Sequence, residues 1–120
     1  TAAVFELDLD AWRASDVQPT RYRPLPKFPA VFRDYAVVVD GSVPGADVAS
    51  AIREAAPELV RDVRFQSAYW SEGLGGGTKS LAWSVTLRAD DHTLTEPEIR
   101  AAEEAVWRSL ADRVGGAPRA

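Results

Sequence analysis

The sequence predicts an α+β sandwich, an antiparallel sheet with two helices on one of its faces. Residues 80–87 alternate between large apolar and small or hydroxylated side chains, which is the period of a strand with one buried face. Residues 44–56 and 96–114 carry apolar side chains at helical spacing. The predicted order of strand, helix, strand, strand and helix is the split βαβ arrangement, which normally ends with one more strand. Only residues 117–120 remain for that last strand.

The strand at 79–87 is expected to turn its apolar side chains toward the helices: Leu81, Trp83, Val85 and Leu87. Its other side chains are small and hydroxylated, so the opposite face of the sheet is expected to stay open to solvent. The other strands are predicted at 34–40 and 60–70, the latter joined to residue 79 by a glycine-rich hairpin loop. A further strand is predicted at 4–9, where Val4 or Phe5 alternates with Leu7 and Leu9, followed by a short turn at 10–12.

Both predicted helices have recognisable ends. Pro44 suits the first turn of the first helix, and Pro57 ends it. Thr95 and Glu98 form a capping box at the start of the second helix, and Gly115-Gly116 stops it. The buried stripes are expected to be Val48, Ala51, Ile52 and Ala55 in the first helix and Ile99, Ala102, Val106, Leu110 and Val114 in the second.

The N-terminal region has a different composition from the rest of the chain. Residues 13–30 contain four prolines and little periodicity, which predicts an ordered linker rather than a helix. We therefore divide the chain into an N-terminal strand and proline-rich linker, residues 1–24, and one folded domain, residues 25–120. A chain of 120 residues is long enough to bury one sizeable core.

Composition excludes several classes of site. The chain has no cysteine and one histidine, so a disulfide, a thiolate zinc site and an imidazole cluster are excluded. No apolar run is long enough to cross a membrane. The net charge of −4 argues against a general nucleic-acid binder. Four cations nevertheless fall within thirteen residues, which suits a few phosphate contacts while a larger assembly supplies most of the affinity: Arg21, Arg23, Lys27 and Arg33.

Two short motifs suggest chemistry that their context does not support. Residues 73–80 resemble a phosphate-binding loop, but Thr78 replaces the last glycine and a strand follows where a helix is required. We interpret them as a mobile hairpin loop. Asp90-Asp91-His92 resembles an acid–base pair, yet no nucleophile accompanies it, and such residues are common in turns. Of the tryptophans, Trp83 is expected in the core and Trp107 half buried. The role of Trp70, at a strand end beside the loop, is open, and packing is favoured.

The open face of the predicted sheet holds the best candidate site. Sheets of this arrangement stack splayed RNA bases on aromatic side chains of the open face, while polar neighbours contact the base edges. Tyr69 has the ring, and Ser67 and Ser80 have the hydroxyls. An exposed tyrosine without a role is the alternative. The sequence therefore predicts an RNA-binding site at these three residues.

Several segments resemble one known family. KSLAW at 79–83 and HTLTEPEI at 92–99 are similar to the signature of the ferredoxin-fold anticodon-binding domain. In bacterial phenylalanyl-tRNA synthetase this is the C-terminal domain of the β subunit. LPKFPAVFRDYAVVV at 25–39 and VPGADVASAIR at 43–53 resemble its first strand and first helix, in the family's order. VFELDLDAW at 4–12 resembles the segment that leads into the domain.

The resemblance implies a ferredoxin-like fold that recognises the anticodon stem-loop of phenylalanine tRNA. Tyr69, Ser67 and Ser80 would then hold the first anticodon base, and the four cations named above would contact phosphates. For Arg33 the alternative is a structural role, together with Asp34, in holding the linker. The implied partners are that tRNA, the rest of the β subunit and the α subunit, in the cytoplasm. ATP and magnesium belong to the whole enzyme, so we expect no cofactor and no catalytic residue in this chain, a non-catalytic part of an ATP-dependent ligase.

The chain departs from the family at three positions. Ser67 stands where the family has Asp, Gln66 where it has Phe, and His92 where it usually has Arg. A bulge near Phe65 could restore the apolar contact that Gln66 removes. The first two changes and the acidic charge favour an alternative interpretation. In that alternative the chain is a diverged paralogue that acts as a protein-interaction or regulatory ferredoxin-like module.

Overall fold

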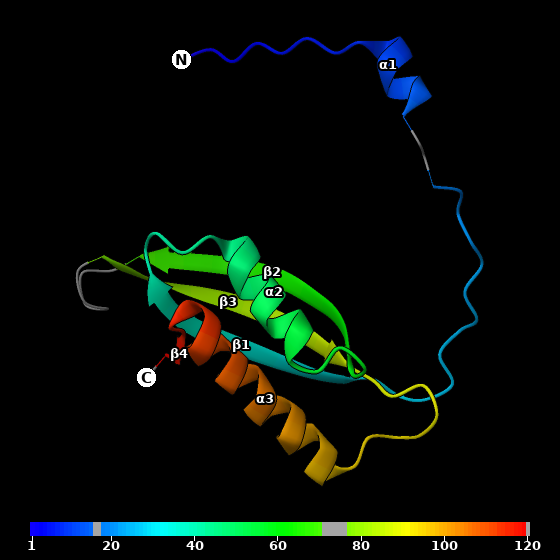
Figure 1. Ribbon diagram of the computed structural model, residues 1–120, viewed down its shortest axis with the longest axis vertical. Coiled ribbons are helices and arrows are strands. Elements are labelled where there is room, and N and C mark those ends of the chain that lie inside the picture. Colours follow the sequence, from blue (N-terminus) through cyan, green and yellow to red (C-terminus); the bar gives the residue numbers. More distant parts are fainter. Residues whose placement is uncertain (16–17, 71–76, 120) are drawn as a thin grey trace.

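The computed structural model describes residues 1–15, 18–70 and 77–119, and their main body is a sheet with two helices on one face (Figure 1). The sheet is four-stranded and antiparallel, in the order β2-β3-β1-β4. The strands are β1 (Val31–Asp40), β2 (Val60–Trp70), β3 (Thr78–Leu87) and β4 (Ala117–Pro118). The helices packed on it are α2 (Gly45–Ala55) and α3 (Glu96–Val114). The predicted ferredoxin-like α+β fold is confirmed.

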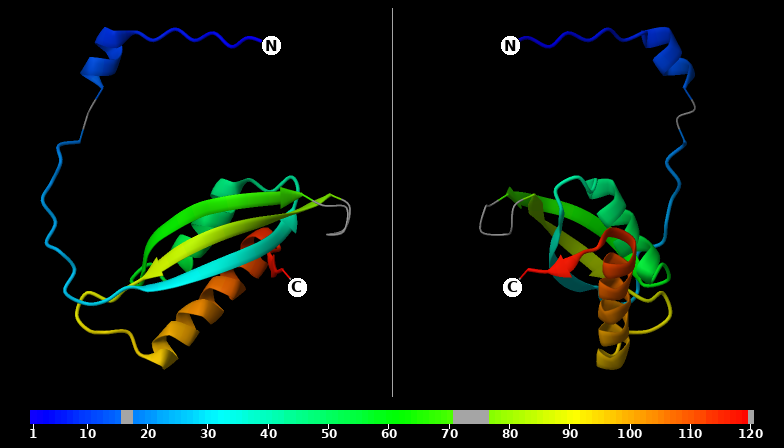
Figure 2. Two further views of the ribbon diagram at one scale, coloured as in Figure 1. Left: turned by 180° about the vertical axis from the view of Figure 1, so that it is seen from behind. Right: turned by 60° about the vertical axis from the view of Figure 1, so that its left-hand side comes forward.

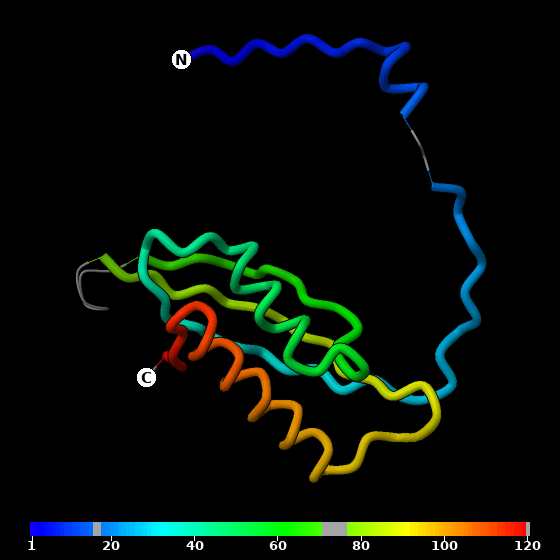
Figure 3. The backbone as a smooth tube through the Cα atoms, in the orientation of Figure 1, coloured from blue at the N-terminus to red at the C-terminus, as the bar shows by residue number. Residues whose placement is uncertain are grey.

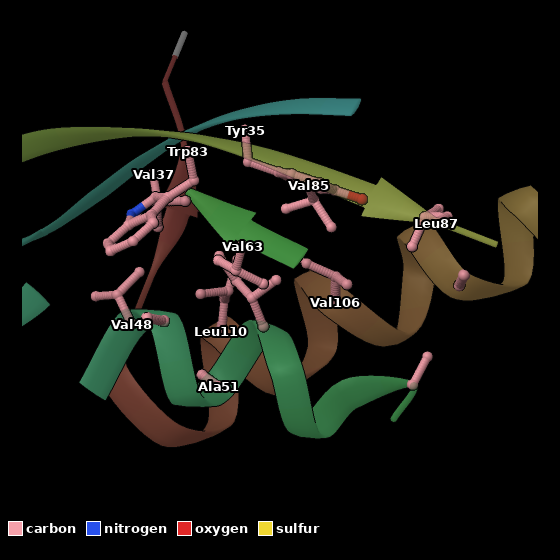
Figure 4. Packing of buried hydrophobic residues seen from close by; sticks show 14 of the residues in the cluster. Tyr35, Val37, Val48, Ala51, Val63, Trp83, Val85, Leu87, Val106 and Leu110 are labelled. Atoms are coloured by element: carbon pink, nitrogen blue, oxygen red, sulfur yellow. The ribbon is translucent and has the colours of Figure 1, made fainter. Parts of the chain in front are cut away.

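The core lies between the sheet and the two helices (Figure 4). All four apolar side chains of β3 are at most 5% exposed, as the alternation predicted. Val106 and Leu110 of α3 are fully buried against them, as is Ile52 of α2. Each such side chain contributes about 1.5–3 kcal/mol by its removal from water. The helices also contact each other, since Ser109 Oγ donates a hydrogen bond of 2.7 Å to the carbonyl of Ala51.

The helix ends follow the predicted signals. Pro44 is the N-cap residue of α2. At α3 the Glu98 carboxylate accepts hydrogen bonds from the backbone N–H and the hydroxyl of Thr95, at 2.8 and 2.7 Å, so the capping box is confirmed. The predicted stripes are buried except at their last residues, Ala55 and Val114, which are half buried because each lies at the end of its helix.

Two glycines allow the sharp turn from α3 into the last strand. Gly115 ends the helix with a φ of 63°, a left-handed conformation that glycine adopts without a steric penalty. A Cβ on Gly116 would lie 2.9 Å from Cγ1 of Val37, so only glycine lets the chain pass this close to β1. The expected final strand forms here, although it is only two residues long.

The tryptophan predictions are confirmed at two positions and wrong at one. Trp83 is 5% exposed, and Trp107 is half buried with its ring edge-on to Tyr35 at 5.4 Å between centroids. Trp70 is 64% exposed, so its predicted packing is wrong. Trp70 is the last residue of β2, which is an edge strand, and the end of β2 extends beyond the part of the strand that α2 covers.

The N-terminal region differs most from its prediction. Residues 1–8 contain no strand, and α1 (Leu9–Ala14) replaces both the end of the predicted strand and the predicted turn. Asp8 caps this helix, since its carboxylate accepts hydrogen bonds of 3.0 Å from the N–H groups of Asp10 and Ala11. Val4 and Phe5 are 95% and 91% exposed because no described strand pairs with them.

A long segment joins α1 to the sheet (Figure 3). Its described residues, 18–30, contain no helix or strand, as predicted for the linker. β1 begins at Val31, three residues earlier than predicted, because its ladder with β3 continues until Val31 lies opposite Leu87.

Candidate nucleic-acid interface

The sheet has one face that no described helix covers (Figure 2, left). We call this the open face. Its central strand, β3, contributes small or hydroxylated side chains: Ser80, Ala82, Ser84 and Thr86. The residues of β1 and β2 that lie directly opposite them in the ladders share this face. Along β3 the open face therefore carries only small side chains, as the sequence predicted, while larger side chains lie beside them on β1 and β2.

A β-bulge in β2 decides which side chains reach the open face. The register with β3 shifts between Phe65, opposite Trp83, and Ser67, opposite Ala82, so Gln66 is the extra residue. The shift puts Phe65 on the helix-packed side, where its ring meets that of Trp83 at 5.4 Å between centroids. The bulge that could restore an apolar contact near Phe65 is therefore present. It leaves Ser67 and Tyr69 together on the open face.

Tyr69, Ser67 and Ser80 are brought together as predicted. Tyr69 lies directly opposite Ser80, and Ser67 is two residues before Tyr69 on the same side of β2. The ring of Tyr69 is half exposed and Ser67 is exposed. Ser80 is only 4% exposed, so its hydroxyl can meet RNA only after a side chain above it moves.

Arg119 completes the site, and the sequence patterns did not predict it. Its backbone N–H donates a hydrogen bond of 2.9 Å to the carbonyl of Ala36 in β1. Its guanidinium carbon lies 5.0 Å from the centroid of the Tyr69 ring, a cation–π contact. Because β3 lies between β1 and β2, these two side chains meet above β3, the strand that carries Ser80.

The predicted phosphate contacts do not lie beside this group. Arg33 points to the helix-packed side, where its guanidinium contacts the Glu103 carboxylate of α3 and the carbonyl of Phe32. Arg21, Arg23 and Lys27 are exposed on the linker, which enters the sheet at the end farthest from Tyr69. Among the described residues, these three cations have no ion pair.

The other two candidate motifs do not form a site. Most of the glycine-rich loop, residues 71–76, lies outside the described residues, so its predicted mobility stays a prediction. His92 bridges two carboxylates, with Nδ1 2.6 Å from Asp91 and Nε2 2.7 Å from Glu98. Hydrogen bonds from the backbone and hydroxyl of Thr95 and from His92 lower the pKa of Glu98 to about 2. This group fastens the turn to the start of α3.

Two further kinds of feature are absent from the part of the chain that the structure describes. No helix in those ranges is both long enough and apolar enough to span a membrane. Within the same residues, no group of three or more metal-ligating side chains is placed to hold an ion.

Comparison with known proteins agrees with the fold. Residues 26–119 match the ferredoxin-fold anticodon binding domain. The chain belongs to this family. The matched region includes the whole sheet, both packed helices and Arg119.

Three bacterial relatives show how much of a longer protein this chain matches. The chain is 44% identical over 118 residues to the phenylalanine–tRNA ligase beta subunit of Moorella thermoacetica, covering 98% of this chain and 15% of that subunit. The corresponding subunits of Streptomyces avermitilis and Anaeromyxobacter dehalogenans are 41% and 42% identical, over 98% and 92% of this chain and 14% of each subunit. The chain therefore spans about one seventh of the length of these relatives. The similarity extends into the segment before residue 26.

Side-chain periodicity gave no signal for the position of Arg119. It lies in a four-residue tail after two glycines, where neither helical nor strand periodicity can be measured. The one available signal was the missing last strand of the split βαβ arrangement, which predicts that this tail runs along β1. Predicting which face of the sheet the Arg119 side chain points to would also have required the register of that strand.

Proposed function

We propose that the open face binds the anticodon stem-loop of phenylalanine tRNA, and that the chain acts as the anticodon-binding part of a phenylalanine–tRNA ligase β subunit. The observation that carries this proposal is the half-exposed Tyr69 ring on the open face of a member of the anticodon-binding family. An aromatic ring on an uncovered sheet face suits an unpaired base, because stacking accepts any base that RNA can splay out.

In this proposal Tyr69 stacks the first anticodon base, while Ser67 and Ser80 contact its edge. The guanidinium of Arg119 now lies 5.0 Å from the ring, whereas a base between two planes needs roughly 7 Å, twice the stacking distance. Arg119 therefore shifts away from the ring when the base enters. From its new position it can contact the second face of the base or a phosphate. The same movement uncovers Ser80.

The catalytic work belongs to the rest of the enzyme. In the proposed assembly, the remainder of the β subunit and the α subunit join phenylalanine to the tRNA in the cytoplasm, using ATP and magnesium. This chain contributes position and selectivity and holds no cofactor. The three linker cations, Arg21, Arg23 and Lys27, contribute phosphate contacts, whereas Arg33 stabilises α3 through Glu103.

The test is binding of the phenylalanine tRNA anticodon stem-loop to the 120-residue chain and to its variants. Tyr69→Ala should weaken binding by about 1–3 kcal/mol, the usual contribution of one stacked base. Tyr69→Phe should bind nearly as well as the natural chain, since it keeps the ring. Trp70→Ala is the matched control, because Trp70 is a neighbouring ring of similar exposure whose side chain points to the other face.

The alternative is a protein-interaction or regulatory module, which the net charge of −4 and the Ser67 departure favour. If the chain does not bind the stem-loop, or if Tyr69→Ala and Trp70→Ala weaken binding equally, the anticodon-binding proposal is wrong and this alternative takes its place.

A further inference from the structure

The open face carries a second exposed aromatic ring, far from Tyr69. Four large apolar side chains of the described sheet are exposed, and two of them, Phe65 and Trp70, point to the helix-packed side. The other two are Tyr69 and Phe32, which is 67% exposed and lies opposite Thr86 of β3 on the open face. Phe65 contacts Trp83. Phe32 has no ring contact among the described residues.

The distance between the two rings suits a single RNA loop. Tyr69 lies opposite Ser80 and Phe32 lies opposite Thr86, so the two positions are six residues apart along β3. At about 3.3 Å per residue, the separation along the strand is roughly 20 Å. In duplex DNA, successive nucleotides of one strand are about 3.4 Å apart along the helix axis, and we take a similar spacing for stacked RNA bases. An RNA strand advances further when its bases are splayed, so a few nucleotides cover this distance.

The positions of Tyr69 and the linker cations favour an RNA path that runs along the open face from Tyr69 toward Phe32. The base site around Tyr69 lies at one end of the open face, whereas the linker with Arg21, Arg23 and Lys27 enters β1 at the opposite end. Phe32 is the second residue of β1, so it lies immediately beside that entry. An RNA that contacts both Tyr69 and the linker cations must therefore cross the open face and pass Phe32.

The charges on this half of the open face favour bases over phosphates. Asp34 lies opposite Ser84 and is exposed, and Asp62 lies opposite Thr86. Arg64 is already in an ion pair with Asp62 at 2.6 Å. Because Arg64 compensates the charge of Asp62, the carboxylate of Asp34, which has no ion pair among the described residues, leaves this area with a net negative charge. That charge repels a phosphate lying directly on the sheet, so the RNA would turn its bases toward the sheet and its backbone outward.

We propose that Phe32 is a second stacking platform, which takes another unpaired base of the same anticodon loop. The proposal rests on the proposed function and adds a second contact to it. Phenylalanine has no hydrogen-bonding group, so this contact is indifferent to base identity and adds affinity and direction rather than sequence discrimination. Tyr69 with its serines then reads a base, and Phe32 holds the loop across the sheet.

The experiment measures binding of the phenylalanine tRNA anticodon stem-loop to the 120-residue chain carrying Phe32→Ala, Phe32→Trp or Phe65→Ala. Phe32→Ala should weaken binding about 5- to 150-fold, the range that corresponds to the loss of one stacked base. Phe32→Trp should bind at least as tightly as the natural chain. Phe65→Ala removes an exposed ring from the other face and should leave the affinity within about twofold of the natural value. Thermal unfolding checks that each variant is folded at the binding temperature.

A second set of ligands locates the base. Stem-loops with one abasic nucleotide at each loop position are tested against Phe32→Ala and Tyr69→Ala. The effect of Phe32→Ala should vanish at one loop position, and the effect of Tyr69→Ala should vanish at a different one. If Phe32→Ala weakens every abasic ligand equally, Phe32 acts through the fold and the inference is overturned.

The two proposals fail in different ways. If Tyr69→Ala weakens binding and Phe32→Ala does not, Phe32 is not a platform, while the anticodon-binding function stands. If the stem-loop does not bind the natural chain, both are overturned.

Discussion

The two faces of the sheet are built from the same strands and have opposite properties. On β3 the apolar side chains are at most 5% exposed beneath α2 and α3, while their neighbours Ala82, Ser84 and Thr86 are partly exposed on the open face. The helices that cover the first face come from two separate parts of the chain. On the open face, by contrast, no described helix packs, and the Arg119 guanidinium lies over the ring of Tyr69. The face that stabilises the fold and the face that we propose binds RNA are thus opposite sides of the same strands, and substitutions should change one without the other.

The largest expected effect is on the helix-packed face. Leu110→Ala removes a fully buried side chain and leaves a cavity, so the free energy of unfolding should fall by about 2–5 kcal/mol. Ser84→Ala, on the open face of β3, should change it by less than about 0.5 kcal/mol. Urea unfolding followed by tryptophan fluorescence measures both. Equal losses for the two variants would contradict the separation of the faces.

The next effect concerns base recognition at Ser67. An aspartate at this position can accept two hydrogen bonds from the N1 and N2 donors of guanine, whereas one hydroxyl is too short to bridge both. Ser67→Asp should therefore increase the preference for guanine over adenine at the first anticodon base by about 1–3 kcal/mol. Binding of stem-loops with either base measures it.

The outcome that would contradict this prediction is specific. If the natural chain already prefers guanine strongly and Ser67→Asp adds nothing, position 67 does not read the base. Gln66, the exposed extra residue of the bulge, would then be the next candidate. Unfolding of Ser67→Asp should match that of the natural chain, because Ser67 is exposed.

The third prediction tests the linker cations. Replacing Arg21, Arg23 and Lys27 together by alanine should weaken stem-loop binding at low salt and flatten its salt dependence. The slope of log K against log salt should fall by about 0.7–0.9 for each phosphate that the variant no longer neutralises. Arg100→Ala is the control, because Arg100 is paired with Glu96 on α3, away from the open face. An unchanged slope in the triple variant would show that the linker does not bind phosphates.

The smallest effect is a pH dependence at the start of α3. Hydrogen bonds with Asp91 and Glu98 raise the pKa of His92 above 6.5, so its stabilisation is present below pH 6.5 and is lost as pH rises through the raised value. Glu98, with a lowered pKa of about 2, loses its contribution only as pH falls from about 4.5 toward 2. His92→Arg keeps the positive charge at all these pH values. The thermal midpoint of the natural chain should therefore fall relative to that of His92→Arg as pH rises above 6.5.

Midpoints measured from mildly acidic to mildly basic pH test this last prediction. The shift should be small, because these ion pairs are partly exposed to solvent and screened by salt. A constant difference between the two proteins across this range would show that His92 does not change its charge there. Equal pH dependence well below pH 6.5 serves as the control, since both side chains are then positively charged.

The amino-acid sequence by itself determined the order of the elements from β1 onward, the buried stripes of α2 and α3, the two faces of β3 and the capping box of Thr95 and Glu98. These features depend on side chains within a few residues of one another, so periodicity and cap chemistry record them locally. The family resemblance then placed Tyr69, Ser67 and Ser80 on one surface. It also marked Gln66 as a departure that a bulge could accommodate, and the register shows that bulge.

Only the tertiary structure decided which partners meet across the sheet. The alternation at residues 4–9 predicted a strand, but a strand needs a neighbouring strand to pair with, and no described strand pairs with these residues. Asp8 instead caps the helix α1, which begins at Leu9. Arg33 contacts Glu103, and Arg119 reaches Tyr69. These contacts join residues 70 and 50 positions apart, and strand register and side-chain direction decide whether they form. A local pattern contains neither quantity, because both arise only when distant segments pack together.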